Sequence, residues 1–398
     1  MSRASATSSS LLATIRLGAL VGMAILTSSW NDVRATAAPV DPDGPYQARR
    51  SRPVTYDVDF SIVVTPPYKA KKLAVWLPLP GDDLGQEIRD SRLSSFPIVV
   101  EPQVAAEEKF GNRFAYFEFA SPQGAQLIRH KFRVTTWELR WDVDPAKVVD
   151  IAKWPASFDK YRRGDSQAVI VDERFEKLLA EVAPRRDAGA GRNLNDVMNW
   201  VQAKFEYDHH DASLKASAVH ALEKRRGHCS DYHGFCASMG RALGVPTRVT
   251  YGINTFPKNS PSHCKLEAYL APYGWVSFDV SETQRLCASI RASADLDDVR
   301  RKDLIERAQL RLARGFRDNT WFLQTRGTDY DLAPKASRRA PVVRTAWIEA
   351  DGVPLPEPDP ADKSQTAFSW MTVHEYRADQ DVAYPFADWK SLTTSDGK

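Results

Sequence analysis

The residue in this sequence best placed to do chemistry is a cysteine at the start of a predicted helix. Cys229 follows Gly227, and residues 232–243 continue with apolar side chains at helical spacing. The first turn of a helix offers unpaired backbone N–H groups and the positive end of the helix dipole, and both stabilise a thiolate. The placement therefore predicts a nucleophile at Cys229, with a buried, inert thiol as the alternative.

A base and an orienting carboxylate follow in two predicted strands. Segment 262–269 alternates in polarity, and a Pro-Tyr-Gly turn separates it from a second strand-like segment at 275–281. The first segment contains His263 and the second contains Asp279. With Cys229 they supply the residue types of a catalytic triad in which sulfur attacks, the imidazole is the general base and the carboxylate orients it.

The register of the two strands decides whether the imidazole and the carboxylate can meet. A minimal turn would pair Ala271 with Trp275 and set Asp279 opposite Glu267. Asp279 would then lie four residues from His263, which is roughly 13 Å along a strand. We therefore expect a wider loop, a bulge or a strong strand tilt between the two segments.

Four motifs around these residues resemble the transglutaminase-like superfamily, in particular its bacterial secreted members. They are Gly227-His228-Cys229-Ser230-Asp231, Gly244-Val245-Pro246-Thr247-Arg248, His263 with Glu267, and Gly274-Trp275 with Asp279. The resemblance implies acyl transfer through a thioester, with Cys229 as nucleophile, His263 as general base and Asp279 as the residue that orients it. Lys265 departs from the family, which usually has tryptophan there, and this departure bears on the substrate-binding wall of the pocket.

The resemblance and the periodicity together predict an α+β fold. The resemblance implies a papain-like transglutaminase core, in which the catalytic helix packs on an antiparallel sheet. Residues 54–64 alternate with a period of two, and strand-like runs follow at 73–79, 114–119 and 128–139 with turn residues between them. Short strands separated by turns predict a β-sandwich in front of the core.

The chain divides into six predicted segments. They are a signal peptide at 1–37, a linker at 38–52, a β-sandwich domain at 53–143, a connector at 144–175, a transglutaminase-like catalytic domain with C-terminal strands at 176–350, and a tail rich in proline and charge at 351–398. The signal peptide is predicted from Arg3 and Arg16 before the apolar run 17–26, with small residues at 35–37 as the cleavage site. We expect export to the periplasm or the medium and no stable membrane span after cleavage; an uncleaved anchor is the alternative.

The charge balance argues against nucleic acid as a partner. The 54 Lys and Arg residues nearly balance the 51 Asp and Glu residues, so the formal net charge is +3. No large basic field for nucleic acid is expected.

An active enzyme must keep Cys229 free, so at most one disulfide can form among Cys236, Cys264 and Cys287. Cys236 lies seven residues after Cys229 on the apolar stripe, which indicates core packing.

A metal site is an alternative to a catalytic role for the histidines and cysteines of this region. His228, Cys229, His233, His263 and Cys264 could cluster in space. No Cys-x-x-Cys or His-x-x-x-His pair is present there, and strand alternation predicts that His263 and Cys264 point to opposite faces. We expect neither a metal nor an organic cofactor.

The motifs predict an exported, thiol-dependent enzyme that attacks an amide or peptide bond. The backbone N–H of Cys229 and the side chain of Tyr207 are candidates for the oxyanion hole. Hydrolysis is the preferred outcome, with a peptide, protein or other amide as substrate. One alternative is a transglutaminase that cross-links glutamine to lysine. The other is a non-catalytic binding or assembly module with a relic active site, which the lysine at position 265 favours. The sequence does not indicate an oligomeric state.

Overall fold

The computed structural model describes residues 40–398 except 259, 360–361, 363, 365–368 and 394–398. The predicted signal peptide at 1–37 lies outside the described residues. Within the described part, no helix has both the length and the apolar character needed to cross a membrane.

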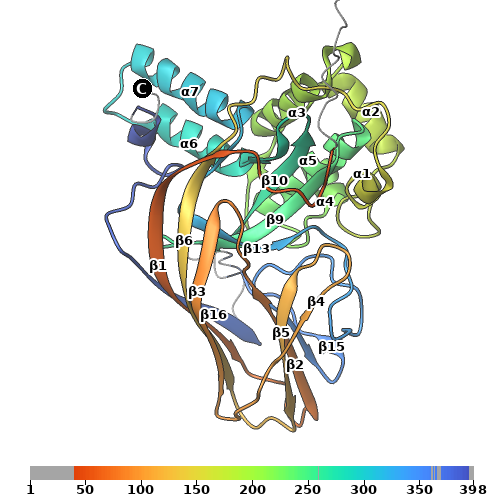
Figure 1. The fold of residues 1–398 in the computed structure, drawn as a ribbon, viewed down its shortest axis with the longest axis vertical. Coiled ribbons are helices and arrows are strands. Elements are labelled where there is room, and N and C mark those ends of the chain that lie inside the picture. Colours follow the sequence, from red (N-terminus) through yellow and green to blue (C-terminus); the bar gives the residue numbers. More distant parts are fainter. Residues whose placement is uncertain (1–39, 259, 360–361, 363, 365–368, 394–398) are drawn as a thin grey trace, which may run out of the picture. The chain divides into compact units, whose positions relative to one another are not determined.

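Two five-stranded antiparallel sheets form the predicted β-sandwich (Figure 1). The strands of the first sheet are β1 (Arg49–Val64), β3 (Gln86–Phe96), β6 (Gln126–Arg140), β12 (Phe316–Arg317) and β16 (Trp370–Ala378). The strands of the second are β2 (Lys72–Leu79), β4 (Gln103–Ala106), β5 (Arg113–Ala120), β14 (Trp347–Ala350) and β15 (Val353–Pro354). Their orders are β12-β6-β1-β16, with β3 also paired to β6, and β15-β14-β2-β5-β4.

The alternation seen in the sequence explains how the sandwich closes. In β1, Val58, Phe60 and Ile62 are buried in one apolar cluster with residues of β2, β5 and β6, while Asp57 and Asp59 face outward. Burying such side chains contributes about 1.5–3 kcal/mol each. The periodicity therefore identifies this core from sequence alone.

The sandwich extends beyond the range predicted for it. Strands β14, β15 and β16 come from the C-terminal part of the chain, and β16 pairs with β1 from Val64 to Tyr56. With β12, the range 53–143 thus lacks four strands of the sandwich, and segment 351–398, predicted as a tail, contributes two of them. The inward positions of β16 include Thr372 and His374, so its sequence carries only a weak apolar alternation.

A four-stranded antiparallel sheet and a central helix form the second part of the fold. The sheet has the order β11-β10-β9-β13, from β9 (Thr247–Asn254), β10 (Ser262–Leu270), β11 (Gly274–Phe278) and β13 (Trp321–Arg326). Every residue of β9, β10 and β11 is buried. Helix α5 (Cys229–Ala242) packs on this sheet and shares one apolar core with it, to which Cys236 belongs. The α+β class and the helix-on-sheet core are confirmed, and Cys236 is a core residue as predicted.

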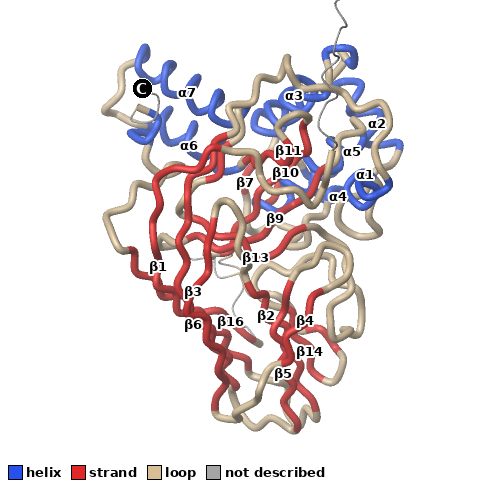
Figure 2. The backbone as a smooth tube through the Cα atoms, viewed as in Figure 1, coloured by secondary structure: helices blue, strands red, loops and turns tan. Residues whose placement is uncertain are grey.

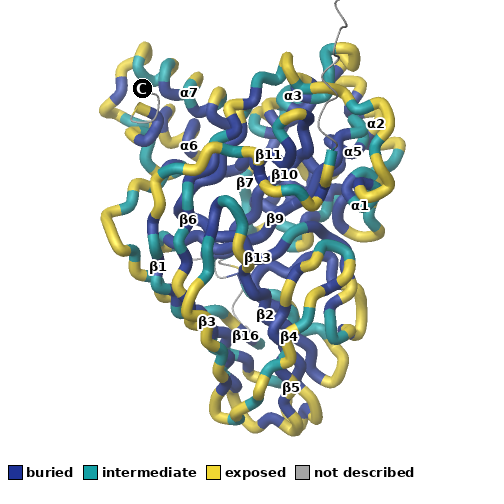
Figure 3. Tube along the Cα trace, in the orientation of Figure 1, coloured by how far each residue is buried: buried dark blue, intermediate teal, exposed yellow. Residues whose placement is uncertain are grey.

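Further helices pack around α5 or against one another beside it (Figure 2). They are α1 (Asp159–Arg162), α2 (Glu173–Val182), α3 (Ala190–Lys204), α4 (Ala218–Lys224), α6 (Val280–Ala292) and α7 (Asp298–Ala313). A short parallel pair, β7 (Glu206–Tyr207) with β8 (Arg226–Gly227), leads into α5. Figure 3 shows that buried positions are concentrated along β9, β10 and β13, so the region around Cys229 lies in the interior.

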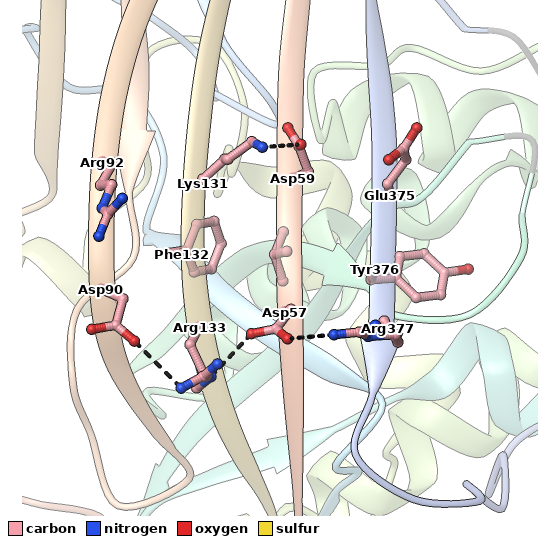
Figure 4. A pocket seen from close by; sticks show the side chains of 11 residues that line it. Asp57, Asp59, Asp90, Arg92, Lys131, Phe132, Arg133, Glu375, Tyr376 and Arg377 are labelled. Carbon is pink, nitrogen blue, oxygen red and sulfur yellow. Dashed lines mark hydrogen bonds and ion pairs between the residues drawn. The ribbon is translucent and has the colours of Figure 1, made fainter.

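A hollow of about 640 Å³ lies on the outer face of the first sandwich sheet (Figure 4). Its charged side chains pair with one another: Asp57 contacts Arg133 and Arg377, and Asp59 contacts Lys131. None of the described residues that line it is a cysteine or a histidine. This hollow therefore offers no nucleophile, and the reactive groups lie elsewhere.

Candidate active site

The residues before Cys229 fix how α5 begins. Gly227 has a φ of 143°, and an added Cβ would collide with the carboxylate of Asp231. That carboxylate accepts a hydrogen bond from the His228 N–H (3.2 Å), and the His228 Nδ1 accepts one from the Ser230 N–H (3.3 Å). This capping box places Cys229 as the first helical residue, where the helix dipole favours a thiolate.

The loop between β10 and β11 sets the distance from the imidazole to the carboxylate. Leu270 pairs with Gly274, so the loop comprises residues 271–273. A minimal turn that paired Ala271 with Trp275 would also leave three residues between the strands, so the loop is not wider than expected for such a turn; it lies one residue earlier in the chain. This displacement changes the register by two residues, so that continued pairing would set Asp279 opposite Lys265 instead of Glu267 and closer to His263.

His263 and Asp279 are in direct contact. The His263 Nε2 donates a hydrogen bond to the Asp279 Oδ2 (2.7 Å), and both side chains are buried. Asp279 also caps α6, because its Oδ1 accepts a hydrogen bond from the Glu282 N–H (3.1 Å). The strand predicted at 275–281 ends at Phe278 in the structure. Asp279 follows as the cap of α6, and this cap holds the Asp279 carboxylate in place.

The contact with Asp279 determines which nitrogen of His263 can exchange a proton. With Nε2 directed at the carboxylate, Nδ1 is the remaining nitrogen, and it is buried without a hydrogen-bond partner among the described residues. Burial alone would lower the pKa of His263, but the charges of Asp279 and Cys229 raise it to about 9. The imidazole is thus held in its protonated form beside the sulfur.

The pKa of the Cys229 thiol is shifted in the opposite direction, downward. Hydrogen bonding with the Cys264 thiol outweighs the effect of burial, and attraction to His263 acts in the same sense. Together they hold the pKa of Cys229 well below its usual range. Opposite shifts in a thiol and an imidazole define a thiolate–imidazolium pair.

A second histidine supports the Cys264 thiol. Burial lowers the pKa of His233 to about 4, so the ring is neutral, and its Nε2 accepts a hydrogen bond from the Val280 N–H (3.1 Å). The proton therefore sits on Nδ1, which lies 3.4 Å from the Cys264 Sγ. Because Cys264 accepts from His233, its own S–H is free to point at Cys229.

His263 and Cys264 have different neighbours: His263 and Lys265, two residues apart, both donate to Asp279, whereas the Cys264 Sγ contacts His233 of α5. Both side chains interact with Cys229. Strand β10 pairs with β9 without a register shift at these two residues. No group of three or more His, Cys, Asp or Glu residues with metal-binding geometry occurs in the described part of the chain.

Replacing Cys264 by alanine should raise the pKa of Cys229, because the thiolate loses the hydrogen bond that most favours it. The pH dependence of iodoacetamide alkylation at Cys229, followed by mass spectrometry, measures this change, and the midpoint should move to higher pH. Cys236→Ala is the matched control, since that buried thiol lies in the core of α5. An unchanged midpoint in Cys264→Ala would contradict the role given to this thiol.

Lys265 does not form a wall of the pocket. Its Nζ donates to the Asp279 Oδ2 (2.6 Å) and to the Asp318 Oδ1 (2.9 Å), and the side chain is fully buried. The ammonium also lies over the ring of Trp321, 5.2 Å from its centroid. Asp279 thus has two cationic neighbours, His263 and Lys265. Although burial opposes ionisation, they hold the pKa of Asp279 well below its usual range.

A cavity of about 180 Å³ opens beside the sulfur. It is lined by Tyr207, His209, His228, Cys229, Lys258, Ser260, Ser262, Arg285 and Arg344. Tyr207, the predicted oxyanion partner, is among them. His228 is a second donor that the sequence did not single out for this role: its Nδ1 accepts a hydrogen bond, so its proton sits on Nε2, which is buried without a partner among the described residues.

A thiol at a helix start, an imidazole on a neighbouring antiparallel strand and a carboxylate behind it form a papain-like constellation. Residues 178–280 match the family model of the Transglutaminase-like superfamily. The chain therefore carries a transglutaminase-like core, and the superfamily predicted from the motifs is confirmed.

Two similar proteins extend this comparison. A protein of Haemophilus influenzae described as uncharacterized is 24% identical over 161 residues, which cover 34% of this chain and 42% of that protein. The alignment thus spans less than half of that relative. A crystal structure of a candidate cysteine protease from Cytophaga hutchinsonii is similar over 87% of this chain and 98% of its own, with a TM-score of 0.59 and 15% identity. The fold, including the sandwich, is shared over almost the whole of both chains.

Proposed function

We propose that this protein is a thiol-dependent acyl-transfer enzyme that hydrolyses an amide or peptide bond through a thioester on Cys229. The observation that carries the proposal is the position of His263, whose Nε2 is held by Asp279 at 2.7 Å while the ring interacts with the Cys229 sulfur. Opposite pKa shifts in the two reacting groups support it, because they prepare the nucleophile and the acid before substrate binds.

In the first half-reaction the Cys229 thiolate attacks the carbonyl carbon of the substrate. The Cys229 backbone N–H and the Nε2–H of His228 or the hydroxyl of Tyr207 hold the oxyanion. The His263 imidazolium then donates its Nδ1 proton to the leaving amine as the C–N bond breaks. This leaves a thioester on Cys229 and a neutral imidazole.

In the second half-reaction His263 accepts a proton from water, and the resulting hydroxide attacks the thioester. The C–S bond breaks, the acid product leaves, and the thiolate–imidazolium pair is restored. Asp279 keeps the imidazole in one orientation throughout, because Glu282, Lys265 and His263 all donate hydrogen bonds to its carboxylate.

The charge of the cavity favours water over a lysine side chain as the acceptor. Lys258, Arg285 and Arg344 line it together with Cys229. A protonated lysine acceptor would meet like charges there.

Export to the periplasm or the medium is part of the proposal and rests on the apolar segment 17–26 and its flanking residues.

Incubation of the protein with glutamine-containing peptides and a tagged primary amine separates hydrolysis from cross-linking. We expect free acid products that depend on Cys229 and little tagged product, because water reaches the thioester and the cationic acceptor is repelled. Mass spectrometry of the peptides measures both, and Cys229→Ala is the control. Amine incorporation that depends on Cys229 would instead support the transglutaminase alternative.

A further inference from the structure

We propose that the substrate carries a carboxylate close to the acyl group that Cys229 attacks, and that Arg344 binds this carboxylate. The inference rests on the proposed function and specifies the substrate class of the same site.

The first observation is the charge of the cavity beside the sulfur. Its lining includes Lys258, Arg285 and Arg344 and, among the described residues, no aspartate or glutamate. Cys229 interacts electrostatically with both arginines. A concave site lined by one sign of charge concentrates ligands of the opposite sign.

The three cations are not equally available. The Lys258 Nζ and the Arg285 Nη1 both contact the Oε1 of Glu282, at 2.9 and 3.0 Å, so one carboxylate partly neutralises the two. The ion pair of Arg344 with Glu357 is longer, 3.5 Å from Nε to Oε1, and the charge of Asp359 also acts on the guanidinium. This distance exceeds that of a good hydrogen bond.

Arg344 also has unused donors in the protein interior. Its side chain is 3% exposed, and its Nε and Nη2 donate to the Ser262 Oγ at 3.2 and 3.0 Å. The Nη1 is buried without a hydrogen-bond partner among the described residues. Leaving buried N–H donors unpaired costs about 1–3 kcal/mol, so an oxygen-bearing ligand at Nη1 would recover this cost. Ser262 precedes His263, which places the guanidinium beside the reacting groups.

Carboxylates of the chain itself already approach this site. Glu357 contacts Arg344, and the Asp359 Oδ2 accepts a hydrogen bond from the Nδ1 of His209, a lining residue, at 3.0 Å. Burial raises the pKa of Glu357 to about 7, so at neutral pH this group is only partly charged and is a weak competitor. The two side chains show that the cavity edge accepts carboxylates.

Two alkylating reagents that differ in charge test the inference. Iodoacetate and iodoacetamide both form a thioether at Cys229 and release iodide, but only the first carries a carboxylate. We measure the second-order rate constant of each at Cys229 by mass spectrometry in the full chain. Arg344→Gln should lower the ratio of the iodoacetate rate to the iodoacetamide rate about tenfold, as loss of a nearby buried cation requires. Both reagents attack the same thiolate, so a change in the ionisation of Cys229 cancels from the ratio.

Several controls keep the result interpretable. Arg377→Gln removes the same charge from the exposed face of β16 and should leave the ratio unchanged. Glu357→Gln should raise the ratio, because it removes a competing carboxylate. Should Arg344→Gln not fold, Arg344→Lys and the wild type in added salt replace it. The ratio should fall in both, since lysine lacks the forked donor set and salt screens the attraction.

The outcomes separate this inference from the function on which it rests. A reactive Cys229 with a ratio that neither Arg344 nor salt affects would overturn the carboxylate subsite and leave the thiol chemistry standing. A Cys229 that shows only ordinary thiol reactivity toward both reagents would overturn the proposed function and the subsite with it.

Discussion

Replacing Lys265 by methionine is expected to lower the free energy of unfolding by about 3–5 kcal/mol, because it removes the cation that two buried carboxylates share. The Lys265 Nζ contacts both Asp279 and Asp318. Urea denaturation followed by circular dichroism measures the change. Lys131→Met is the matched control, since Lys131 pairs with Asp59 on the exposed face of the sandwich and should cost at most about 1 kcal/mol.

A double variant shows whether the loss arises from charge. In Lys265→Met with Asp318→Asn, one of the two carboxylates that lost this cation is neutral, so part of the stability should return. Equal destabilisation by Lys265→Met and Lys131→Met would contradict the account. The result also bears on the alternative that the protein is a non-catalytic module with a relic active site. If Lys265 holds the Asp279 carboxylate in place, the lysine at this position no longer favours that alternative.

Replacing His263 by alanine should lower kcat/KM for amide hydrolysis by at least about a thousandfold, since the site loses the acid that protonates the leaving amine. Activity of the wild type should also fall as pH rises through about 9, because the raised pKa of His263 marks the loss of that proton. Steady-state kinetics on a peptide found in the hydrolysis assay measure both effects. His220→Ala, on α4, is the control and should stay close to wild type. A His263→Ala variant that keeps most of its activity would remove this residue from the mechanism.

Much of the site could be predicted because its signals are local. The glycine before Cys229, the helical stripe after it and the strand pattern around His263 each occupy a few neighbouring residues. Local patterns reflect backbone preferences that act over one turn or one strand. They predicted Cys229, His263 and Asp279, whose side chains the structure brings into one buried cluster.

The remaining features depend on contacts between distant segments. Lys265 meets Asp318, 53 residues away, and Arg344 meets Ser262, 82 residues away. The register of β10 against β11 depends on where the loop between them begins, which the alternation of the two strands does not specify. No local pattern encodes these contacts, and the same holds for β16, whose weak alternation becomes a sandwich strand only when it pairs with β1.

The pH dependence of Cys229 alkylation by iodoacetamide, in the wild type and in His263→Ala, tests the central claim most directly. The claim is that the protein holds a thiolate–imidazolium pair before substrate binds. The account predicts that wild-type Cys229 keeps its full reactivity well below the pH range in which ordinary thiols ionise, and that His263→Ala moves the profile into that range. A wild-type profile already in the ordinary range, and unchanged in His263→Ala, would contradict it.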